Sequence, residues 1–278
     1  MLPYPDIDPV LLHIGPLQIR WYGLMYVLGF ASSYLLVKQQ LKQVHFPELQ
    51  EHFENLNITL IISIIIGGRL GYVLFYNLGY YLQNPAEIPA TWSGGMSFHG
   101  AAIGLVVAGI WFCRRKKIDF FKAADIYIVT IPVGLCLGRI GNFINGELFG
   151  RPSDLPWSMI FPAGGPVPRH PSQLYEAFFE GLVLFALLWS LRKKPYQAKA
   201  DVWPHGSMLA LFFIAYGTFR FCLEYTREPD PQVGLFLNLL SMGQILSGLM
   251  VGAGLLLWAL LIKTRGAAGQ KGHSSRET

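Results

Sequence analysis

Long apolar runs recur along the chain, and seven of them can cross a bilayer as α-helices of about 20 residues. The predicted spans are Trp21 to Val37, Asn57 to Tyr76, Met96 to Cys113, Ala123 to Asn142, Leu174 to Leu191, Gly206 to Tyr225 and Asn238 to Ile262. The fourth contains Pro132 and Arg139, which a membrane helix tolerates only among neighbouring helices. The pattern predicts an all-α, polytopic membrane bundle with seven transmembrane helices.

The composition supports a membrane protein. Of the 278 residues, 52% are hydrophobic and 14% are charged, whereas soluble domains average about 25% charged residues. An ordinary cytoplasmic enzyme is therefore excluded, and three cysteines are too few for a disulfide scaffold. The amino-terminal stretch has no basic region and holds Asp6 and Asp8. We therefore expect no cleavable signal peptide, and expect the first span to act as an uncleaved insertion signal.

Basic residues between the spans predict the orientation. Alternate loops carry most of them, namely Lys38, Lys42, Arg114, Arg115, Lys116, Lys117, Lys122, Arg192, Lys193, Lys194, Lys199, Lys263, Arg265, Lys271 and Arg276. The other loops hold only Arg151, Arg169 and Arg227. Cytoplasmic loops are the basic ones, so the amino terminus is expected outside and the carboxy terminus in the cytoplasm. The net charge of +5 then indicates topology and no nucleic-acid partner.

This topology divides the chain into a membrane-embedded domain, 1–265, and a disordered cytoplasmic tail, 266–278. The longest outer loop, 143–173, is rich in glycine and proline and also holds aromatic residues. A loop of this length without periodicity is usually functional or disordered. Its aromatics favour a segment that rests at the membrane surface.

Three arginines lie inside predicted spans: Arg69, Arg139 and Arg220. A charge at bilayer depth costs about 2.5–3.5 kcal/mol on insertion scales, so such residues usually face the protein interior and mark a site. The spans that hold them run outward, which places all three in the outer half of the membrane. His99 opens an inward-running span and Tyr26 lies early in the first, so both are expected near the same face. Channels and transporters more often place polar groups near the midplane.

The predicted partners of these charges differ between spans. Arg220 and Glu224 are four residues apart on the same helix face as Tyr216, so they are able to neutralise each other. Arg139 has no carboxylate in the outer half of its own span and is predicted to be unpaired. Asp125, near an inner span end, is expected to be an interfacial carboxylate.

Glycines surround two of the arginines. The patterns are Gly68-Arg69-Leu70-Gly71 and Gly138-Arg139-Ile140-Gly141, with Gly67 and Gly134 nearby. Small residues three or four apart let membrane helices approach closely, so these helices are expected to pack tightly.

Buried arginines at the outer leaflet suit phosphate, which guanidinium groups bind bidentately. The obvious phosphate at that depth is a phospholipid head group. No histidine, aspartate or cysteine pair has metal-ligand spacing. An outer-leaflet phospholipid transporter or flippase is the alternative, although polar access from the cytoplasmic side is lacking. An intramembrane protease is disfavoured because no Ser-His or paired-Asp arrangement emerges.

Several motifs resemble those of the bacterial prolipoprotein diacylglyceryl transferases. The resemblance rests first on two motifs, Gly138-Arg139-Ile140-Gly141-Asn142-Phe143-Ile144-Asn145-Gly146-Glu147 with Gly150, and His170-Pro171-Ser172-Gln173-Leu174-Tyr175-Glu176. Shorter matches lie around Tyr26, Arg69, His99, Tyr216, Arg220, Glu224, Arg227 and Pro229-Asp230. It covers nearly the whole chain. The tail is not part of it.

The resemblance implies transfer of the diacylglyceryl group of phosphatidylglycerol to the lipobox cysteine of a prolipoprotein, with release of glycerol phosphate. It implies the bacterial cytoplasmic (inner) membrane, a site at the periplasmic leaflet, and neither metal nor cofactor. The expected catalytic residues are His99, Arg139 and Arg220, with His99 either the general base or a positioning donor. Expected substrate-binding residues are Arg139, Arg220, Tyr26, Asn142, Glu147, Gly150, Tyr216, Glu224 and Arg69.

Overall fold

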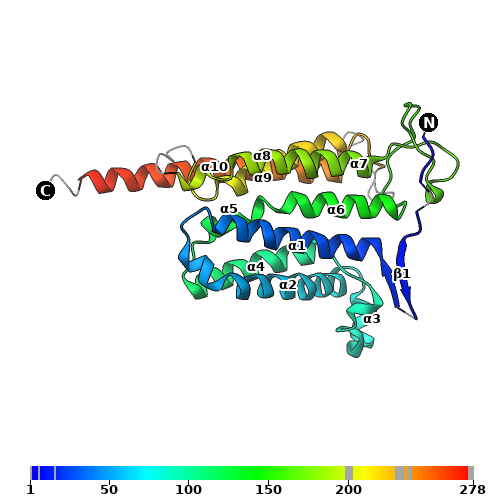
Figure 1. The fold of residues 1–278 in the computed structure, drawn as a ribbon, viewed down its shortest axis with the longest axis horizontal. Helices are drawn as coiled ribbons and strands as arrows, with labels where there is room; N and C mark the ends of the chain where they lie inside the picture. The colour runs from blue at the N-terminus through cyan, green and yellow to red at the C-terminus, as the bar shows by residue number, and fades with distance from the viewer. Residues whose placement is uncertain are drawn as a thin grey trace. The chain divides into compact units, whose positions relative to one another are not determined.

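A computed structural model describes residues 2–5, 7–15, 17–197, 203–228, 235–236 and 240–274 of the chain (Figure 1). This part is mostly helical. The helices are α1 (Trp21–Leu41), α2 (Pro47–Phe75), α3 (Leu78–Gln83), α4 (Phe98–Lys116), α5 (Phe120–Ile128), α6 (Ile131–Ile144), α7 (Ser172–Glu176), α8 (Leu184–Leu191), α9 (Ser207–Leu223) and α10 (Met242–Ser274), and a π-helical segment, Ala177–Val183, joins α7 to α8.

Short strands, which the sequence did not predict, form two antiparallel pairs: β1 (Val10–Ile14) with β2 (Leu17–Arg20), and β3 (Leu235–Phe236) with β4 (Leu240–Ser241). Gly15 lies in the turn between β1 and β2 at a φ of 59°, a conformation that glycine adopts without strain. The chain divides into two compact units, Met1–Val44 with Ala124–Thr278, and His45–Ala123. The sequence had predicted one membrane domain over residues 1–265.

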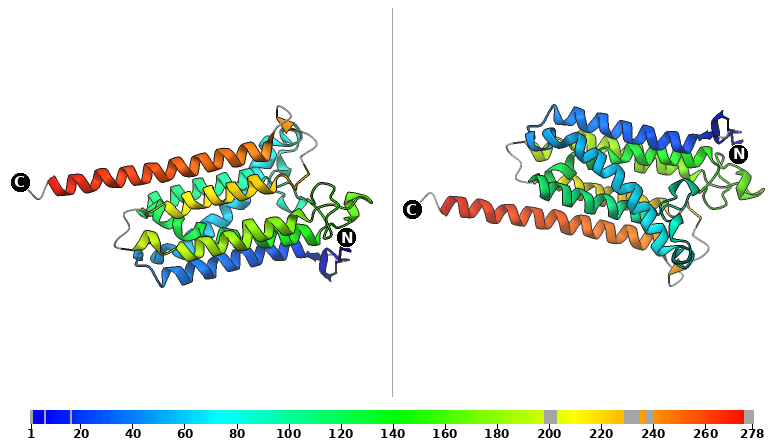
Figure 2. Two further views of the ribbon diagram at one scale, coloured as in Figure 1. Left: turned by 90° about the horizontal axis from the view of Figure 1, so that it is seen from above. Right: turned by 90° about the horizontal axis from the view of Figure 1, so that it is seen from below.

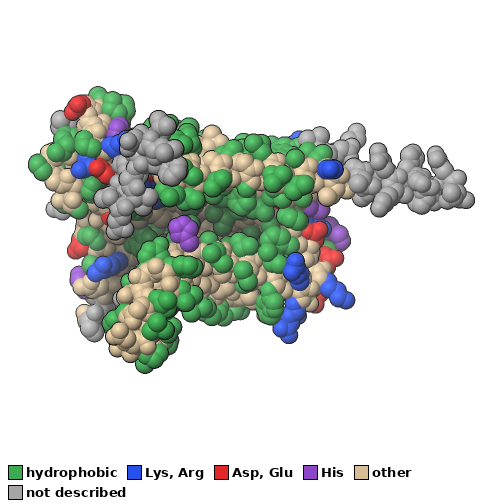
Figure 3. All heavy atoms as spheres, turned by 180° about the vertical axis from the view of Figure 1, so that it is seen from behind, with side chains coloured by type: hydrophobic (Ala, Val, Ile, Leu, Met, Phe, Trp, Pro, Cys, Tyr) green, Lys and Arg blue, Asp and Glu red, His purple; other side chains and the backbone are tan. Residues whose placement is uncertain are grey.

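Six of the seven predicted spans overlap one continuous helical stretch each, and the span Ala123 to Asn142 overlaps both α5 and α6. Within the described residues, three helices are long and apolar enough to cross a membrane: Pro47–Phe75, Ser172–Tyr196 and Met242–Thr264. The pair α5 and α6, bent by 40°, makes a fourth if it counts as one span, and α9 is a shorter apolar helix. Hydrophobic side chains cover much of the face drawn in Figure 3, as a lipid-facing surface requires.

The predicted span Ala123 to Asn142 is broken rather than continuous. Pro132 lies in the first turn of α6, and proline disfavours helical backbone at the residue before it and donates no amide hydrogen. The Thr130 hydroxyl lies 2.7 Å from the Tyr127 carbonyl oxygen and 2.7 Å from the Ser33 hydroxyl. The break is therefore stabilised by side-chain hydrogen bonds.

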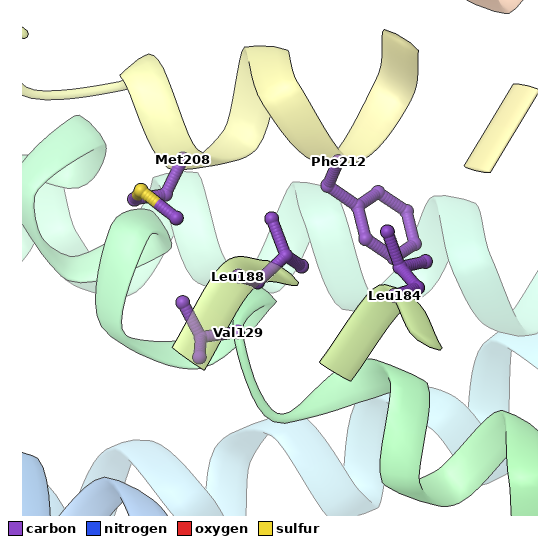
Figure 4. Close-up of a cluster of buried hydrophobic side chains, with 5 residues drawn as sticks. All are labelled: Val129, Leu184, Leu188, Met208 and Phe212. Atoms are coloured by element: carbon purple, nitrogen blue, oxygen red, sulfur yellow. The ribbon is translucent and has the colours of Figure 1, made fainter. Parts of the chain in front are cut away.

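In the first unit, α1 packs against α6 and α9 packs against α10, as both views of Figure 2 show. A buried cluster joins α8 and α9 to the α5–α6 break, with Val129, Leu184, Leu188, Met208 and Phe212 directed toward one another (Figure 4). α10 continues to Ser274, which differs from the disorder predicted from residue 266. Adding a residue to an existing helix costs far less than starting one. Residues 275–278 lie outside the described part.

Asp125, which was expected only as an interfacial carboxylate, has a buried side chain that holds the start of α9. Its Oδ2 accepts the Gly206 amide at 2.7 Å, and its Oδ1 accepts those of Met208 and Leu209 at 2.9 and 3.2 Å. The first amides of a helix have no partner within the helix, and a negative charge there is favourable. Asp125 therefore fixes α9 against α5.

In the second unit, glycines bring α2 and α4 together. A Cβ at Gly67 would lie 2.5 Å from the Gly100 carbonyl oxygen, and one at Gly71 would lie 2.7 Å from the Gly100 Cα. One at Gly104 would lie 2.6 Å from the Ser63 carbonyl oxygen. The predicted close packing is confirmed for Gly67 and Gly71. Gly134 is approached closely by Gly29 of α1, where a Cβ would lie 3.3 Å from the Gly134 Cα, whereas a Cβ at Gly138 would meet nothing within 4 Å.

We predict that Asp125→Asn lowers the free energy of unfolding by about 1–3 kcal/mol, because an amide nitrogen then faces a backbone donor that it cannot accept from. Thermal unfolding in detergent measures the change. Asp154→Asn, at an exposed position in the outer loop, is the matched control. Equal unfolding temperatures for the two variants would contradict the capping role.

Candidate active site

Two arginines from different helices converge on one buried carboxylate. Arg139 lies in the second half of α6, and its Nε is 2.8 Å from Glu176 Oε2. Arg220 lies near the end of α9, and its Nη1 is 2.9 Å from Glu176 Oε1. The Glu176 side chain is 1% exposed, against 17% and 15% for the arginines. The buried carboxylate therefore binds both guanidiniums from the protein side, and the arginines keep an edge toward the surroundings.

A second carboxylate, Glu180, lies behind the same pair. Its Oε2 is 3.6 Å from Arg139 Nη2 and its Oε1 is 3.8 Å from Arg220 Nη1. Arg139 was predicted to be unpaired, and that prediction is wrong, since both its carboxylate partners come from the helix Ser172–Tyr196. Inspection of its own span could not find them. Glu176 had appeared only as part of a motif and Glu180 not at all, although two acids within one apolar run were a signal.

Glu224 completes the cluster and confirms the predicted pairing with Arg220. Its Oε2 is 2.7 Å from Arg220 Nη2, and the Ser241 hydroxyl donates to its Oε1 at 3.0 Å. A Cβ at Gly243 would lie 2.5 Å from Glu224 Oε1, so glycine is needed where α10 begins. Ser241 also accepts the Gln244 amide, and Gln244 Oε1 accepts the Ser241 amide, which is the reciprocal arrangement of a capping box.

Arg227 links the cluster to the outer loop. Its Nη1 lies 3.5 Å from Glu176 Oε1, and its carbonyl oxygen accepts the Arg151 Nε at 2.7 Å. Beside this contact the Gly150 amide donates to the His170 carbonyl oxygen at 2.9 Å. A Cβ at Gly150 would lie 2.7 Å from His170 Cβ. Gly150 is thus required by close packing.

The outer loop, predicted to be functional or disordered, is tied together by backbone bridges such as the pair between Met159 and Arg169. Trp157 donates its indole N–H to the Tyr175 hydroxyl at 2.6 Å, and that hydroxyl lies 3.3 Å from His170 Nδ1. Burial lowers the pKa of the His170 imidazole below its usual 6.5, so the ring is neutral at neutral pH.

The other predicted site residues of the first unit are Tyr26, Asn142, Glu147 and Tyr216, and they differ in exposure. Tyr26 is half exposed, and its hydroxyl lies 3.1 Å from that of Tyr22. Asn142 is buried near the end of α6. Glu147 is exposed, and its Oε1 accepts from Asn145 at 3.2 Å. The Tyr216 ring stacks on Phe212 with centroids 5.4 Å apart.

Two predicted site residues, Arg69 and His99, belong to the second unit. His99 lies in the first turn of α4 with an exposed side chain, and the Ser97 hydroxyl accepts the Gly100 amide at 3.2 Å. Arg69 is 4% exposed. The Arg69 guanidinium donates to the carbonyl oxygens of Glu87, Ile88, Gly94 and Gly95 at 2.6–3.2 Å and lies 5.0 Å from the Tyr81 ring centroid.

The surroundings of Arg69 therefore favour a structural role rather than the predicted contact with substrate. Each of its three guanidinium nitrogens already donates to the backbone of residues 87–95. Arginine suits this task because its planar fork reaches several acceptors at once. The residue orders the loop that leads into α4.

Three arginines and three glutamates thus form a compact cluster in an apolar helical setting, an arrangement suited to recognising an anion. Among the described residues no group of three or more His, Cys, Asp or Glu side chains could hold a metal ion. Fold and cluster define a polytopic helical membrane protein with a charged site among its helices.

Comparison with known proteins identifies the family. A profile of the prolipoprotein diacylglyceryl transferases matches residues 9–260. Relatives named phosphatidylglycerol–prolipoprotein diacylglyceryl transferase include one from Desulfotalea psychrophila, 58% identical over 91% of this chain and 93% of the relative. One from Bordetella avium is 52% identical over 94% and 97%, and one from Photobacterium profundum is 49% identical over 93% and 95%. The chain belongs to the prolipoprotein diacylglyceryl transferase family.

We predict that Arg69→Lys destabilises the protein by about 1–3 kcal/mol, because an ammonium group cannot serve all the carbonyls that the guanidinium serves. Thermal unfolding and limited proteolysis of the 84–95 segment measure the effect. Arg114→Lys, at an exposed position on α4, is the control. Unchanged unfolding and protease resistance in Arg69→Lys would contradict the structural role.

Proposed function

We propose that this chain transfers the diacylglyceryl group of phosphatidylglycerol to the cysteine thiol of a prolipoprotein, with Arg139 and Arg220 holding the lipid phosphate. Family membership supports the reaction. The observation that carries the site is the convergence of both guanidiniums on Glu176, at 2.8 and 2.9 Å. Guanidinium groups bind phosphate and carboxylate in the same fork geometry. A phosphate at their exposed edge therefore finds two cations already aligned.

The reaction increases the charge that these arginines face. The cysteine sulfur attacks the glyceryl carbon, the bond between that carbon and the phosphate oxygen breaks, and its electron pair leaves with glycerol phosphate. A phosphodiester carries one negative charge, whereas the released monoester carries about 1.5 to 2 at neutral pH. Fixed cations stabilise the larger charge that develops on the leaving phosphate more than they stabilise the single charge of the bound phosphodiester. The arginines thus serve binding and the transition state.

The thiol proton needs an acceptor, and we assign that task to His99. A free cysteine has a pKa of about 8.5, so only a few per cent is thiolate at neutral pH. The exposed ring of His99 at the start of α4 is accessible to a substrate. Imidazole is the commonest general base in enzymes. The substrate supplies the nucleophile, so no cysteine of this chain takes part.

The other predicted residues support the arginines or the lipid. Glu224 fixes Arg220 through its contact at 2.7 Å. Gly150 lets the outer loop pack against Thr226 and Arg227, which follow α9, and Arg69 acts through the loop it orders. Tyr26, Asn142, Glu147 and Tyr216 remain proposed substrate contacts. This assignment separates the residues that hold phosphate from those that hold the arginines.

We further propose seven spans, with the amino terminus outside and the carboxy terminus in the cytoplasm of a bacterium. The alternation of basic loops supports this orientation. Six predicted spans overlap one helical stretch each, and the seventh overlaps the bent pair of α5 and α6. The site then lies at the periplasmic leaflet of the inner membrane, where phosphatidylglycerol and the prolipoprotein reach it from the bilayer. The loop 143–173 lies at that surface with exposed Trp157 and Ile160.

We predict that Arg139→Ala lowers the transfer rate by about 10²–10³-fold, as removal of a charge-stabilising donor does in other enzymes. Transfer from phosphatidylglycerol to a lipobox peptide in mixed micelles measures it. Arg114→Ala, on the exposed surface, is expected to stay active. Full activity of Arg139→Ala would contradict the proposal.

A second variant separates catalysis from folding. Arg139→Ala leaves the three glutamates of the cluster facing only Arg220 and Arg227, an uncompensated buried charge that is destabilising. Combining Arg139→Ala with Glu180→Gln returns the cluster to neutrality. The double variant is expected to regain thermal stability and stay inactive. Recovery of activity together with stability would show that Arg139 serves only the fold.

For His99→Gln we predict a lower rate that rises about tenfold per pH unit up to the thiol pKa near 8.5, because ionisation of the substrate then limits the reaction. Measuring the rate at subsaturating peptide from about pH 6 to about pH 9 tests this pH dependence. A pH profile that matches the parent's would remove His99 from the role of base.

A further inference from the structure

Glu180 is the most completely buried charge of the cluster, with 0% exposure. Neither of its carboxylate oxygens has a hydrogen-bond partner among the described residues. A buried carboxylate without hydrogen bonds is costly, and it persists where nearby charges compensate for it. Here the compensating charges are Arg139 and Arg220, at 3.6 and 3.8 Å. The longer distances distinguish Glu180 from Glu176, whose oxygens lie 2.8 and 2.9 Å from nitrogens of the same arginines.

The local backbone brings Glu180 to this position. Glu180 lies within the π-helical segment Ala177–Val183. Such widened turns are rare in proteins, and those that occur are often found at functional sites. The next residue, Gly181, packs on α6, since a Cβ there would lie 2.5 Å from Cys136 Cβ. Cys136 and Arg139 are three residues apart and share a face of α6. The packing of Gly181 on Cys136 therefore sets the distance between Glu180 and Arg139.

The two glutamates affect the arginines in different ways. Glu176 occupies Nε of Arg139 and Nη1 of Arg220. Glu180 lies beyond hydrogen-bond distance, so it attracts both guanidiniums without occupying an N–H group. The ion pairs of Arg139 with Glu176 and Glu180 involve Nε and Nη2, not Nη1. The donors of Nη1 remain for a ligand.

We propose that Glu180 is a positioning residue for the phosphate site: its charge holds the guanidiniums of Arg139 and Arg220 within reach of one phosphate while leaving their donors free. This inference rests on the proposed function of the two arginines. Without Glu180, Arg220 keeps its contacts with Glu176 and Glu224, whereas Arg139 keeps only Glu176 among the described carboxylates. Arg139, which the neighbouring cation repels, then turns away from Arg220. The charge of Glu180 thus makes the arginines a pair.

Steady-state kinetics test this proposal. Glu180→Gln is expected to raise KM for phosphatidylglycerol about tenfold, the loss expected for one charge contact near 4 Å in a partly shielded site. Because the bound phosphate itself draws the two arginines together, the alignment that Glu180 supplies matters most in the free enzyme, and kcat is expected to change less than about threefold. Glu180→Asp keeps the charge and is expected to recover most of the affinity. Glu51→Gln, at an exposed position on α2, is the matched control.

A purely structural residue would give a different result, namely a lower unfolding temperature and fewer active molecules, hence a lower apparent kcat at unchanged KM. Unchanged KM in Glu180→Gln, or no recovery in Glu180→Asp, would overturn the proposal. Parent protein that fails to modify the peptide would instead contradict the proposed function itself.

Exchanging the sizes of two residues in contact, Gly181 and Cys136, tests the same proposal without altering any charge. This experiment replaces the kinetic test if the Glu180→Gln protein does not accumulate. Gly181→Ala places a methyl group against Cys136 and moves Glu180 away from Arg139, so KM is expected to rise. Adding Cys136→Gly removes the opposing Cβ and is expected to lower KM again. A double variant with the KM of Gly181→Ala alone would overturn the proposal.

Discussion

Two guanidinium groups share one buried carboxylate, and the first unit is arranged around this contact. Arg139 and Arg220 come from α6 and α9, and Glu176 comes from α7. A charge left uncompensated among apolar helices is costly. These three helices therefore have to assemble together, and their pairing selects one register. Gly181 and Gly243 permit the close approaches that deliver the carboxylates.

The same constraint explains how such a cluster serves catalysis. Arginines held by carboxylates are already ordered and partly dehydrated, so a phosphate exchanges one set of oxygen acceptors for another. The exposure of their side chains, 17% and 15%, leaves an edge for that exchange. As the leaving phosphate gains charge, the same contacts strengthen without rearrangement. A site of this kind needs a substrate that brings its own nucleophile, and the lipobox thiol is one.

The sequence predicted what depends on local composition. Apolar runs gave the positions of the helices, and the cost of a charge in the bilayer singled out Arg139 and Arg220. It failed where a partner lies on another element. Arg139 seemed unpaired because its carboxylates lie on a distant helix, Asp125 proved to cap α9, and Arg69 binds backbone carbonyls of a loop. Backbone acceptors have no sequence signature, since every residue carries one.

The central claim is that Arg139 and Arg220 hold the lipid phosphate, and a distance measured in the membrane tests it most directly. Solid-state NMR detects dipolar coupling between ³¹P of phosphatidylglycerol and ¹⁵N of arginine guanidinium groups in protein reconstituted in that lipid. We predict a coupling that corresponds to direct contact. We also predict that the coupling is reduced when either arginine is replaced by lysine, while the remaining arginines keep their ¹⁵N label. A coupling of full strength in both variants, or none in the parent protein, would contradict the claim.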